Sequence, residues 1–102
     1  MAGAQGAGGA TEVDLELVLA VDVSGSMDDE EHAVQRAGYV AAIGHPDFVR
    51  AIAAGAYQRI ALTYVEWAGP TLQATVMPWR LIDGAASAGA FADDLAARPI
   101  TY

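Results

Sequence analysis

The sequence predicts an α/β domain whose first two strands are parallel. Segments 13–21 and 58–68 are rich in apolar residues, as strands buried on both faces are. Segment 28–43 lies between them and repeats its apolar residues at helical spacing, and a helical crossover joins parallel strands. Sheets of this kind bind ligands beyond the carboxyl ends of their strands. Asp22 stands at that end of the first strand, so we expect a functional site there.

Two helices are expected between these strands. Acids in the first turn of helix 28–43 suit the helix dipole, and Ser26 with Asp29 resembles a capping box. Gly44 ends this helix, and Pro46 begins a shorter one. The apolar stripe that should face the sheet from the first helix consists of Val34, Ala37, Val40, Ala41 and Ile43.

A hairpin and a final helix complete the predicted fold. Residues 72–77 follow a Gly-Pro turn and alternate in polarity, which predicts an edge strand antiparallel to the second strand. Pro78 has no amide proton and should block ladder pairing, which suits an edge strand. Asp83 suits the N-cap of a last helix over 84–97, which Pro99 stops. The inner face of this helix should be formed by Ala88, Phe91, Ala92 and Leu95.

Length and composition fit one small folded domain after a flexible segment. The 102 residues are 54% hydrophobic, which is not the composition of a disordered protein. Residues 1–12 are small and polar, so we place a flexible N-terminal segment there and the domain at 13–102. Residues 2–5, Ala-Gly-Ala-Gln, look like the end of an export signal and suggest a periplasmic or secreted protein. An ordinary N-terminal segment explains them equally well, so the compartment stays open.

Charge and residue usage exclude several classes of protein. Five basic and thirteen acidic residues give a net charge of −8, which repels nucleic acids and anionic membranes. The absence of cysteine excludes disulfides, thiol catalysis and thiolate metal sites. No apolar run is long enough to span a bilayer. We therefore expect neither a nucleic-acid partner nor a transmembrane segment.

The motif after the first strand brings three oxygen-bearing side chains together. In "LVLAVDVSGSMDDEE", residues 17–31, Asp22 is followed by Ser24 and Ser26 at alternate positions. Hard cations such as Mg²⁺ prefer oxygen ligands and keep some of their waters. Because two of these ligands are neutral, a bound cation would keep excess positive charge and an open coordination position. An acidic side chain of another protein could occupy that position.

The sequence "DVSGSM" after an apolar strand resembles the metal-ion-dependent adhesion site of von Willebrand factor A domains. The stretches "VDLELVLAVDVSGSM", "RIALTYVEWAG" and "WRLIDGAASAGAFADDLAA" are similar to a bacterial branch of that family without an assigned function. The resemblance covers residues 13–97. It implies a Rossmann-like, three-layer α/β fold, of which the chain would carry the first half, with the first three strands and their helices.

The resemblance also implies a function. Ser24 and Ser26 would bind Mg²⁺ or Mn²⁺ directly, Asp22 directly or through water, and a partner protein would supply an acidic side chain. In the family, a threonine and an aspartate from two later loops complete the site, and both loops would follow the end of this chain. The closing "PITY" does not match the threonine loop, so Thr101 is not assigned. The metal is therefore expected to bind this part of the domain weakly or not at all, and the protein is expected to be a binding module rather than an enzyme.

Other interpretations of Asp22 use different chemistry. An EF-hand calcium loop that starts there needs glycine and glutamate where the chain has Met27 and Ala33. A magnesium-dependent phosphoryl-transfer or phosphatase-like enzyme, with Asp22 as nucleophile, is the stronger alternative. Ser24 then stands where such enzymes usually have a carboxylate as general acid. In the simplest interpretation, Ser26 only caps the helix and Asp22 only binds nearby amides.

The remaining polar and aromatic residues are expected to have ordinary structural roles. The acids at 28–31 should form a solvated helical turn, and His32 and His45 should lie at the surface. Glu66, at the end of the second strand, is either a polar strand-end residue, which we favour, or a hydrogen-bond acceptor behind the metal ligands. The residues that pack against the core should include Trp67 and Trp79.

One edge of the first strand is expected to lack a partner in this part of the fold. The segment "LELVLAVDV" would then be a long apolar edge, which tends to pair with other chains. We expect the isolated chain to be unstable, oligomeric or prone to aggregation, with self-association through that edge.

Overall fold

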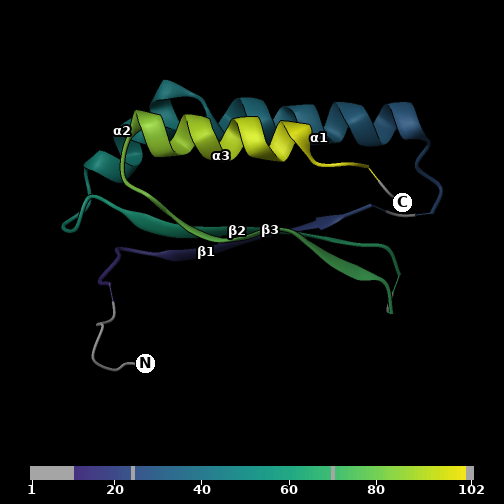
Figure 1. Cartoon of the computed structure of the whole chain (residues 1–102), viewed down its shortest axis with the longest axis horizontal. Coiled ribbons are helices and arrows are strands. Elements are labelled where there is room, and N and C mark those ends of the chain that lie inside the picture. Colours follow the sequence, from purple (N-terminus) through teal and green to yellow (C-terminus); the bar gives the residue numbers. More distant parts are fainter. Residues whose placement is uncertain (1–10, 24, 70, 101–102) are drawn as a thin grey trace.

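The computed structural model describes residues 11–23, 25–69 and 71–100, and these contain three strands and three helices (Figure 1). The strands are β1 (Glu16–Asp22), β2 (Ile60–Trp67) and β3 (Gln73–Ile82), and the helices are α1 (Asp29–Ile43), α2 (Pro46–Ala53) and α3 (Ala85–Ala97). The predicted α/β class and the order of the elements are confirmed. Within these ranges, no helix combines the length and apolar character needed to cross a membrane.

The sheet has the order β1-β2-β3, with β2 parallel to β1 and antiparallel to β3. Both pairings agree with the predictions from the sequence. The expectation that Pro78 blocks ladder pairing on an edge strand agrees with the structure, because no residue of β2 pairs with Pro78. The predicted end of the strand at residue 77 is wrong, because β3 continues to Ile82. The pairing of β3 with β2 shifts on either side of Tyr64. A proline is tolerated at such an irregularity on an edge strand, where its missing amide proton breaks no regular ladder.

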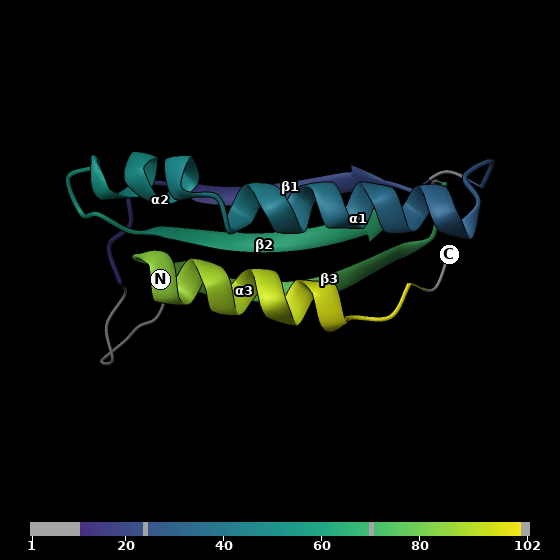
Figure 2. The same ribbon diagram turned by 90° about the horizontal axis from the view of Figure 1, so that it is seen from above.

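The three helices of the described chain lie on one face of the sheet (Figure 1). Seen from above, α1 and α2 lie over β1 and β2, and α3 lies over β3 (Figure 2). The side chains of β1 alternate accordingly: Val21 is buried, whereas Val18, which points to the other face, is 50% exposed. The prediction that the first strand is buried on both faces is therefore wrong for the part of the domain that the structure describes.

The face of the sheet opposite the helices, here called the bare sheet face, is largely apolar. Strand register and alternation place seven apolar side chains on it: Val18, Ala20, Ala61, Val65, Trp67, Trp79 and Leu81. Trp67 and Trp79 are 38% and 52% exposed, so the expectation that both pack against the core is wrong. The described part of the chain thus has two layers, not the three that the resemblance implies.

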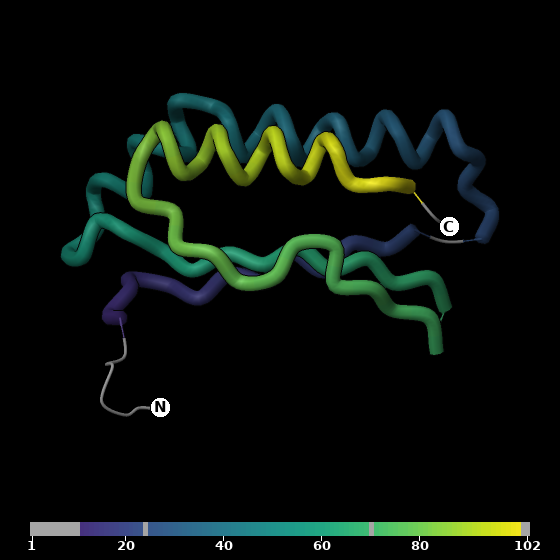
Figure 3. The backbone as a smooth tube through the Cα atoms, viewed as in Figure 1, coloured from purple at the N-terminus to yellow at the C-terminus, as the bar shows by residue number. Residues whose placement is uncertain are grey.

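The core lies between the sheet and the helices. Figure 3 follows α1 and α3 as neighbouring helices above the sheet, and the two are in contact. The predicted inner face of α3 is confirmed, because all four of its residues are buried. The buried apolar residues include Val21, Ile43, Ile52, Ile60, Leu62, Tyr64, Met77, Ile82, Ala88, Phe91, Ala92 and Leu95.

The inward face of α1 differs from the predicted apolar stripe. Val34 is 68% exposed, whereas His32 and Arg36 are buried together with Ile43. The spacing of these three residues also places them on one face of a helix. Because two of them are polar, the pattern of hydrophobic residues alone indicates the wrong face of α1.

The carboxylate of Asp14 holds the turn before β2. Its Oδ1 accepts a hydrogen bond from the amide of Tyr57 at 3.0 Å, and its Oδ2 accepts one from the amide of Gln58 at 3.0 Å. Gln58 has a φ of 58°, which is uncommon for a residue with a side chain. A Cβ atom at Gly55 would lie 2.1 Å from Oδ2 of Asp14. A side chain at position 55 would therefore displace the carboxylate from the amides that it holds.

We expect Gly55→Ala to lower the free energy of unfolding by about 1–2 kcal/mol, because Asp14 must give up these hydrogen bonds. The matched control is Gly89→Ala in α3, where a Cβ would meet nothing within 4 Å. Alanine should stabilise that helix by about 0.5–1 kcal/mol. Urea unfolding measures both changes, and equal midpoints for the two variants would contradict the role of Asp14.

Candidate functional site

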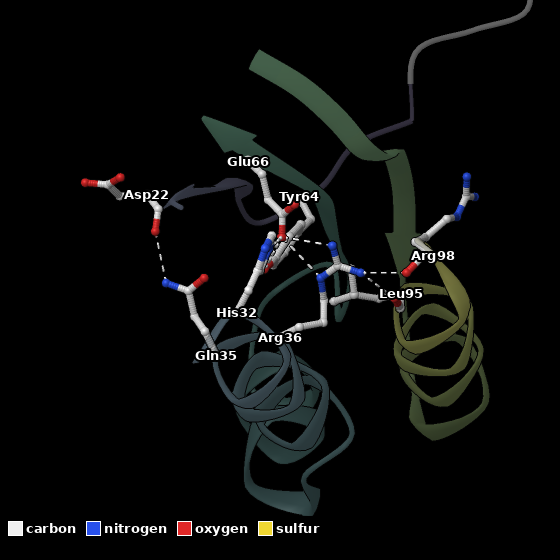
Figure 4. Close-up of polar contacts among 8 residues, drawn as sticks. All are labelled: Asp22, His32, Gln35, Arg36, Tyr64, Glu66, Leu95 and Arg98. Atoms are coloured by element: carbon white, nitrogen blue, oxygen red, sulfur yellow. Dashed lines mark hydrogen bonds and ion pairs between the residues drawn. The ribbon is translucent and has the colours of Figure 1, made fainter. Parts of the chain in front are cut away.

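The carboxyl ends of β1 and β2 lie side by side and carry the predicted site. Asp22 ends β1 and pairs with Trp67, which ends β2. The amide of Val23 donates to the carbonyl of Trp67 at 2.9 Å. Gln35 of α1 donates its Nε2 proton to the carbonyl of Asp22 at 3.0 Å (Figure 4). The backbone at the predicted ligand is therefore fixed by both the sheet and α1.

The side chain of Asp22 is exposed at this end of the sheet. In Figure 4 it points away from Gln35 and from Glu66. Among the described residues, nothing forms a hydrogen bond or an ion pair with this carboxylate. The interpretation that Asp22 serves only to bind nearby amides has no support in this part of the chain. The carboxylate is accessible to a ligand from solvent.

The two serines of the motif belong to the loop between β1 and α1. Ser26 is exposed in a turn, and Ser24 lies outside the described residues. The predicted helix cap at Ser26 is wrong, because Asp28 is the N-cap. Its Oδ1 accepts from the amide of Glu31 at 2.8 Å, and Oε1 of Glu31 accepts from the amide of Asp28 at 3.1 Å. The acids at the start of α1 thus form the capping box, two residues later than the sequence indicated.

The groups at this end of the sheet fit a hard divalent cation held by oxygen atoms. Asp22 offers an exposed carboxylate, and the loop offers a hydroxyl at Ser26. Oε1 of Gln35 is buried with no hydrogen-bond partner in the described chain, as happens where another group completes a site. No set of three or more His, Asp or Glu residues converges on a metal position within the described ranges. A cation here would therefore depend on the mixed carboxylate and hydroxyl ligands of the motif.

A buried charged cluster lies behind the motif, between α1 and β2. Glu66 is only 1% exposed, and its Oε2 accepts from Nε2 of His32 at 3.1 Å (Figure 4). The same oxygen accepts from Nη2 and Nε of Arg36 at 2.9 and 3.2 Å. It also accepts from the hydroxyl of Tyr64 at 3.4 Å. These four residues are called the Glu66 cluster below.

Arg36 connects the Glu66 cluster to the end of α3. Its Nη1 donates to the carbonyl of Leu95 at 3.2 Å and to the carbonyl of Arg98 at 3.0 Å. Carbonyl groups at the end of a helix have no partner within the helix, and a positive charge nearby is favourable. The last turn of α3 contains no basic residue. Arg36 therefore supplies from α1 the charge that α3 lacks.

Several predictions about single residues need correction here. His32 is 1% exposed, so the expectation that it lies at the surface is wrong, whereas His45 is exposed and its Nδ1 accepts from the amide of Asp47. Glu66 is a buried acceptor and not a solvated residue at a strand end. Two features of the sequence could have indicated the cluster. His32 and Arg36 are four residues apart on one helix, and Glu66 is a single carboxylate in an apolar strand.

The fold and the site define a small α/β domain with an oxygen-rich loop at the carboxyl end of a parallel strand. The chain belongs to the family DUF1194, described as a protein of unknown function, whose sequence profile matches residues 12–102. The comparisons with curated proteins and with solved structures gave no match. The family description names neither an activity nor a von Willebrand factor A domain.

Tyr64 gives the Glu66 cluster a pH dependence. Burial, together with the negative charge of Glu66, raises the pKa of the Tyr64 hydroxyl from 10.0 to about 12, against the opposing effect of Arg36. The folded chain therefore keeps a proton that the unfolded chain releases near pH 10. The stabilisation is fully present below that pH and is lost as the pH rises toward 12.

We expect the free energy of unfolding to fall by up to about 2 kcal/mol between pH 10 and 12 because of Tyr64. Tyr64→Phe should remove this part of the alkaline loss, since phenylalanine has no proton to release. Urea unfolding at a series of pH values, with tyrosine ionisation followed at 295 nm, measures the effect. An alkaline limb that is the same in Tyr64→Phe and in the original chain would contradict it.

Proposed function

We propose that this chain carries a metal-ion-dependent protein-binding site. Mg²⁺ or Mn²⁺ would be held in part by Asp22, Ser24 and Ser26, in keeping with the resemblance of "DVSGSM" to an adhesion site. The observation that carries the proposal is the exposed carboxylate of Asp22, which ends a parallel strand and is free of ion pairs in the described chain. Its backbone is held on two sides, so the ligand has a fixed position.

The chemistry of the ligands favours binding over catalysis. One carboxylate and two neutral hydroxyls leave about half of the charge of a divalent cation uncompensated, and waters complete its coordination. A carboxylate from a partner protein would replace a water and gain a strong electrostatic contact. We therefore expect a partner with an exposed Asp or Glu side chain, and no reaction.

A phosphoryl-transfer enzyme with Asp22 as nucleophile would need a cation for the phosphate. The one arginine of α1 is Arg36, which is only 4% exposed. Its guanidinium forms an ion pair with Glu66 and donates to carbonyl groups at the end of α3. It is therefore not available to a phosphate ester, which supports the binding module over the enzyme. Hydrolysis of p-nitrophenyl phosphate with Mg²⁺ that is lost in Asp22→Asn would reverse this preference.

Asp22→Ala should weaken the binding of Mn²⁺ by about tenfold or more, because it removes the one charged ligand of the motif. Trp67 pairs with Asp22 across the strands, so quenching of its fluorescence by Mn²⁺ reports binding close to the site. Asp29→Ala is the matched control. It removes an exposed carboxylate in the first turn of α1 that takes no part in the capping box, and should change affinity about twofold at most.

Uptake of Mn²⁺ with equal affinity by the original chain and Asp22→Ala would contradict the assignment of Asp22. Electron paramagnetic resonance of free Mn²⁺ measures binding without the Trp67 fluorescence. Applied to Trp67→Phe, it distinguishes a loss of the fluorescence reporter from a loss of Mn²⁺ binding. In that variant, Mn²⁺ should bind as in the original chain, since the indole is a reporter and not a ligand.

We also propose that the free edge of β1 mediates self-association. β1 pairs with β2 on one side, and on its other side no strand is present among the described residues. The edge is apolar in its centre and adjoins the bare sheet face, where Val18 is 50% exposed. Unpaired backbone groups along such an edge form hydrogen bonds with a strand from another copy.

Val18→Lys should shift the chain toward the monomer, because a charge on an edge strand opposes pairing. Val34→Lys, on the exposed side of α1, adds the same charge away from the edge and should leave association unchanged. Sedimentation velocity measures the distribution of species. Salt should strengthen association, since the net charge of −8 makes copies repel one another. A monomeric original chain at high protein concentration and high salt would contradict this proposal.

A further inference from the structure

The Glu66 cluster lies directly behind the predicted metal ligands. Glu66 pairs across the strands with Val21, the residue before Asp22. Neighbouring residues of a strand point to opposite faces, so Val21 and Glu66 lie on the helix side and Asp22 on the other. Glu66 is thus level with the residue that precedes Asp22 at the end of β1. The other side of the cluster, formed by His32 and Arg36, belongs to α1, the helix that follows the loop.

His32 brings this cluster to the start of α1. It follows the N-cap residue Asp28 by four positions, which is about one helical turn. The loop from 23 to 28 is therefore anchored at both ends. At its β1 end, Val23 forms a backbone hydrogen bond with Trp67, and Asp22 accepts one from Gln35. At its α1 end, His32 forms a hydrogen bond with Glu66 of β2. The separation between Asp22 and Ser26 thus depends on how the first turn of α1 sits on β2.

We propose that His32 is a positioning residue for the metal ligands. Its hydrogen bond to Glu66 fixes the first turn of α1 against β2 and so sets the position of Ser26 relative to Asp22 for a divalent cation. This inference rests on the proposed metal site. Arg36 forms the main charge pair with Glu66, and a replacement of His32 leaves both members of that pair in place. The contribution of His32 can therefore be measured separately from the stability of the buried pair.

The type of contact supports a positioning role. His32 and Glu66 are both 1% exposed, so the fold removes both polar groups from water to bring them into hydrogen-bond contact. Apolar residues of similar size would often hold the helix to the sheet at least as well. A hydrogen bond is directional, whereas apolar packing is not. It therefore restricts the range of angles through which α1 can rotate about its axis. Small cations such as Mg²⁺ demand such precision from their ligands.

The test compares three variants of the whole chain by Mn²⁺ binding and by amide hydrogen exchange of segment 22–28. His32→Leu removes the donor and keeps the Glu66–Arg36 pair, whereas His32→Gln retains an amide donor. Tyr64→Phe is the matched control, because it removes another donor to the same oxygen of Glu66 from within β2. We expect His32→Leu to weaken Mn²⁺ binding by about tenfold or more and to speed exchange in the loop by a similar factor. His32→Gln should recover part of both, and Tyr64→Phe should change neither.

The outcomes distinguish this inference from the proposed function. If His32→Leu binds Mn²⁺ and exchanges as the original chain does, the positioning role is overturned and the metal site stands. If the original chain takes up no Mn²⁺, the metal site fails, and the exchange data alone decide whether His32 orders the loop. An effect of Tyr64→Phe as large as that of His32→Leu would assign the result to general loosening of the cluster and overturn the inference. If His32→Leu does not fold, His32→Asn replaces it, because its shorter side chain does not reach Glu66.

Discussion

The buried ion pair between Glu66 and Arg36 connects the main elements of this small domain. Glu66 belongs to β2, the central strand, and Arg36 belongs to α1 and also binds the last carbonyls of α3. One guanidinium thus compensates the charge of a buried carboxylate and satisfies carbonyl groups at a helix end. Removing one member of such a pair typically costs about 3–5 kcal/mol, which is a large share of the stability of a domain of this size. The relative positions of α1, α3 and the sheet depend on it.

The pleat of the sheet separates this structural pair from the predicted ligands. Val21 and Glu66 point toward the helices, and their neighbours Asp22 and Trp67 belong to the opposite face. Charges on the helix side neutralise one another in the core, whereas the carboxylate of Asp22 keeps its charge at the surface. Adjacent positions on two strands therefore belong to the buried cluster and to the candidate site, and α1 is the element that connects the two.

The one-sided cover of the sheet has consequences for the domain as a whole. Side chains of the bare sheet face, among them Trp67 and Trp79, contribute less burial than their size would allow. The edge of β1 adds backbone groups with no strand partner in the described chain. Together they leave apolar side chains and unpaired backbone groups exposed on the side of the sheet where Asp22 lies. A surface of this kind usually marks contact with other protein material.

Local patterns in the sequence are sufficient to predict most of the elements and the place of the candidate site in the fold. The apolar run that ends in Asp22 predicts β1, the 3.6-residue spacing predicts the inner face of α3, and the helical crossover predicts that β1 and β2 are parallel. Each of these features depends on residues that are close in the chain. The position of Asp22 at the carboxyl end of a parallel strand follows directly from them.

Only the tertiary structure shows that α1 turns His32 and Arg36 inward. Their partner Glu66 is 34 and 30 residues away, and a hydrophobic pattern assigns polar residues to the solvent unless a distant partner compensates them. The exposure of Val18 and Trp79 also depends on how many layers cover the sheet, which no local pattern contains. The passage of β3 through Pro78 depends on its place at the edge of the sheet. In each case the decisive interaction, or its absence from the described chain, involves segments that are distant in sequence.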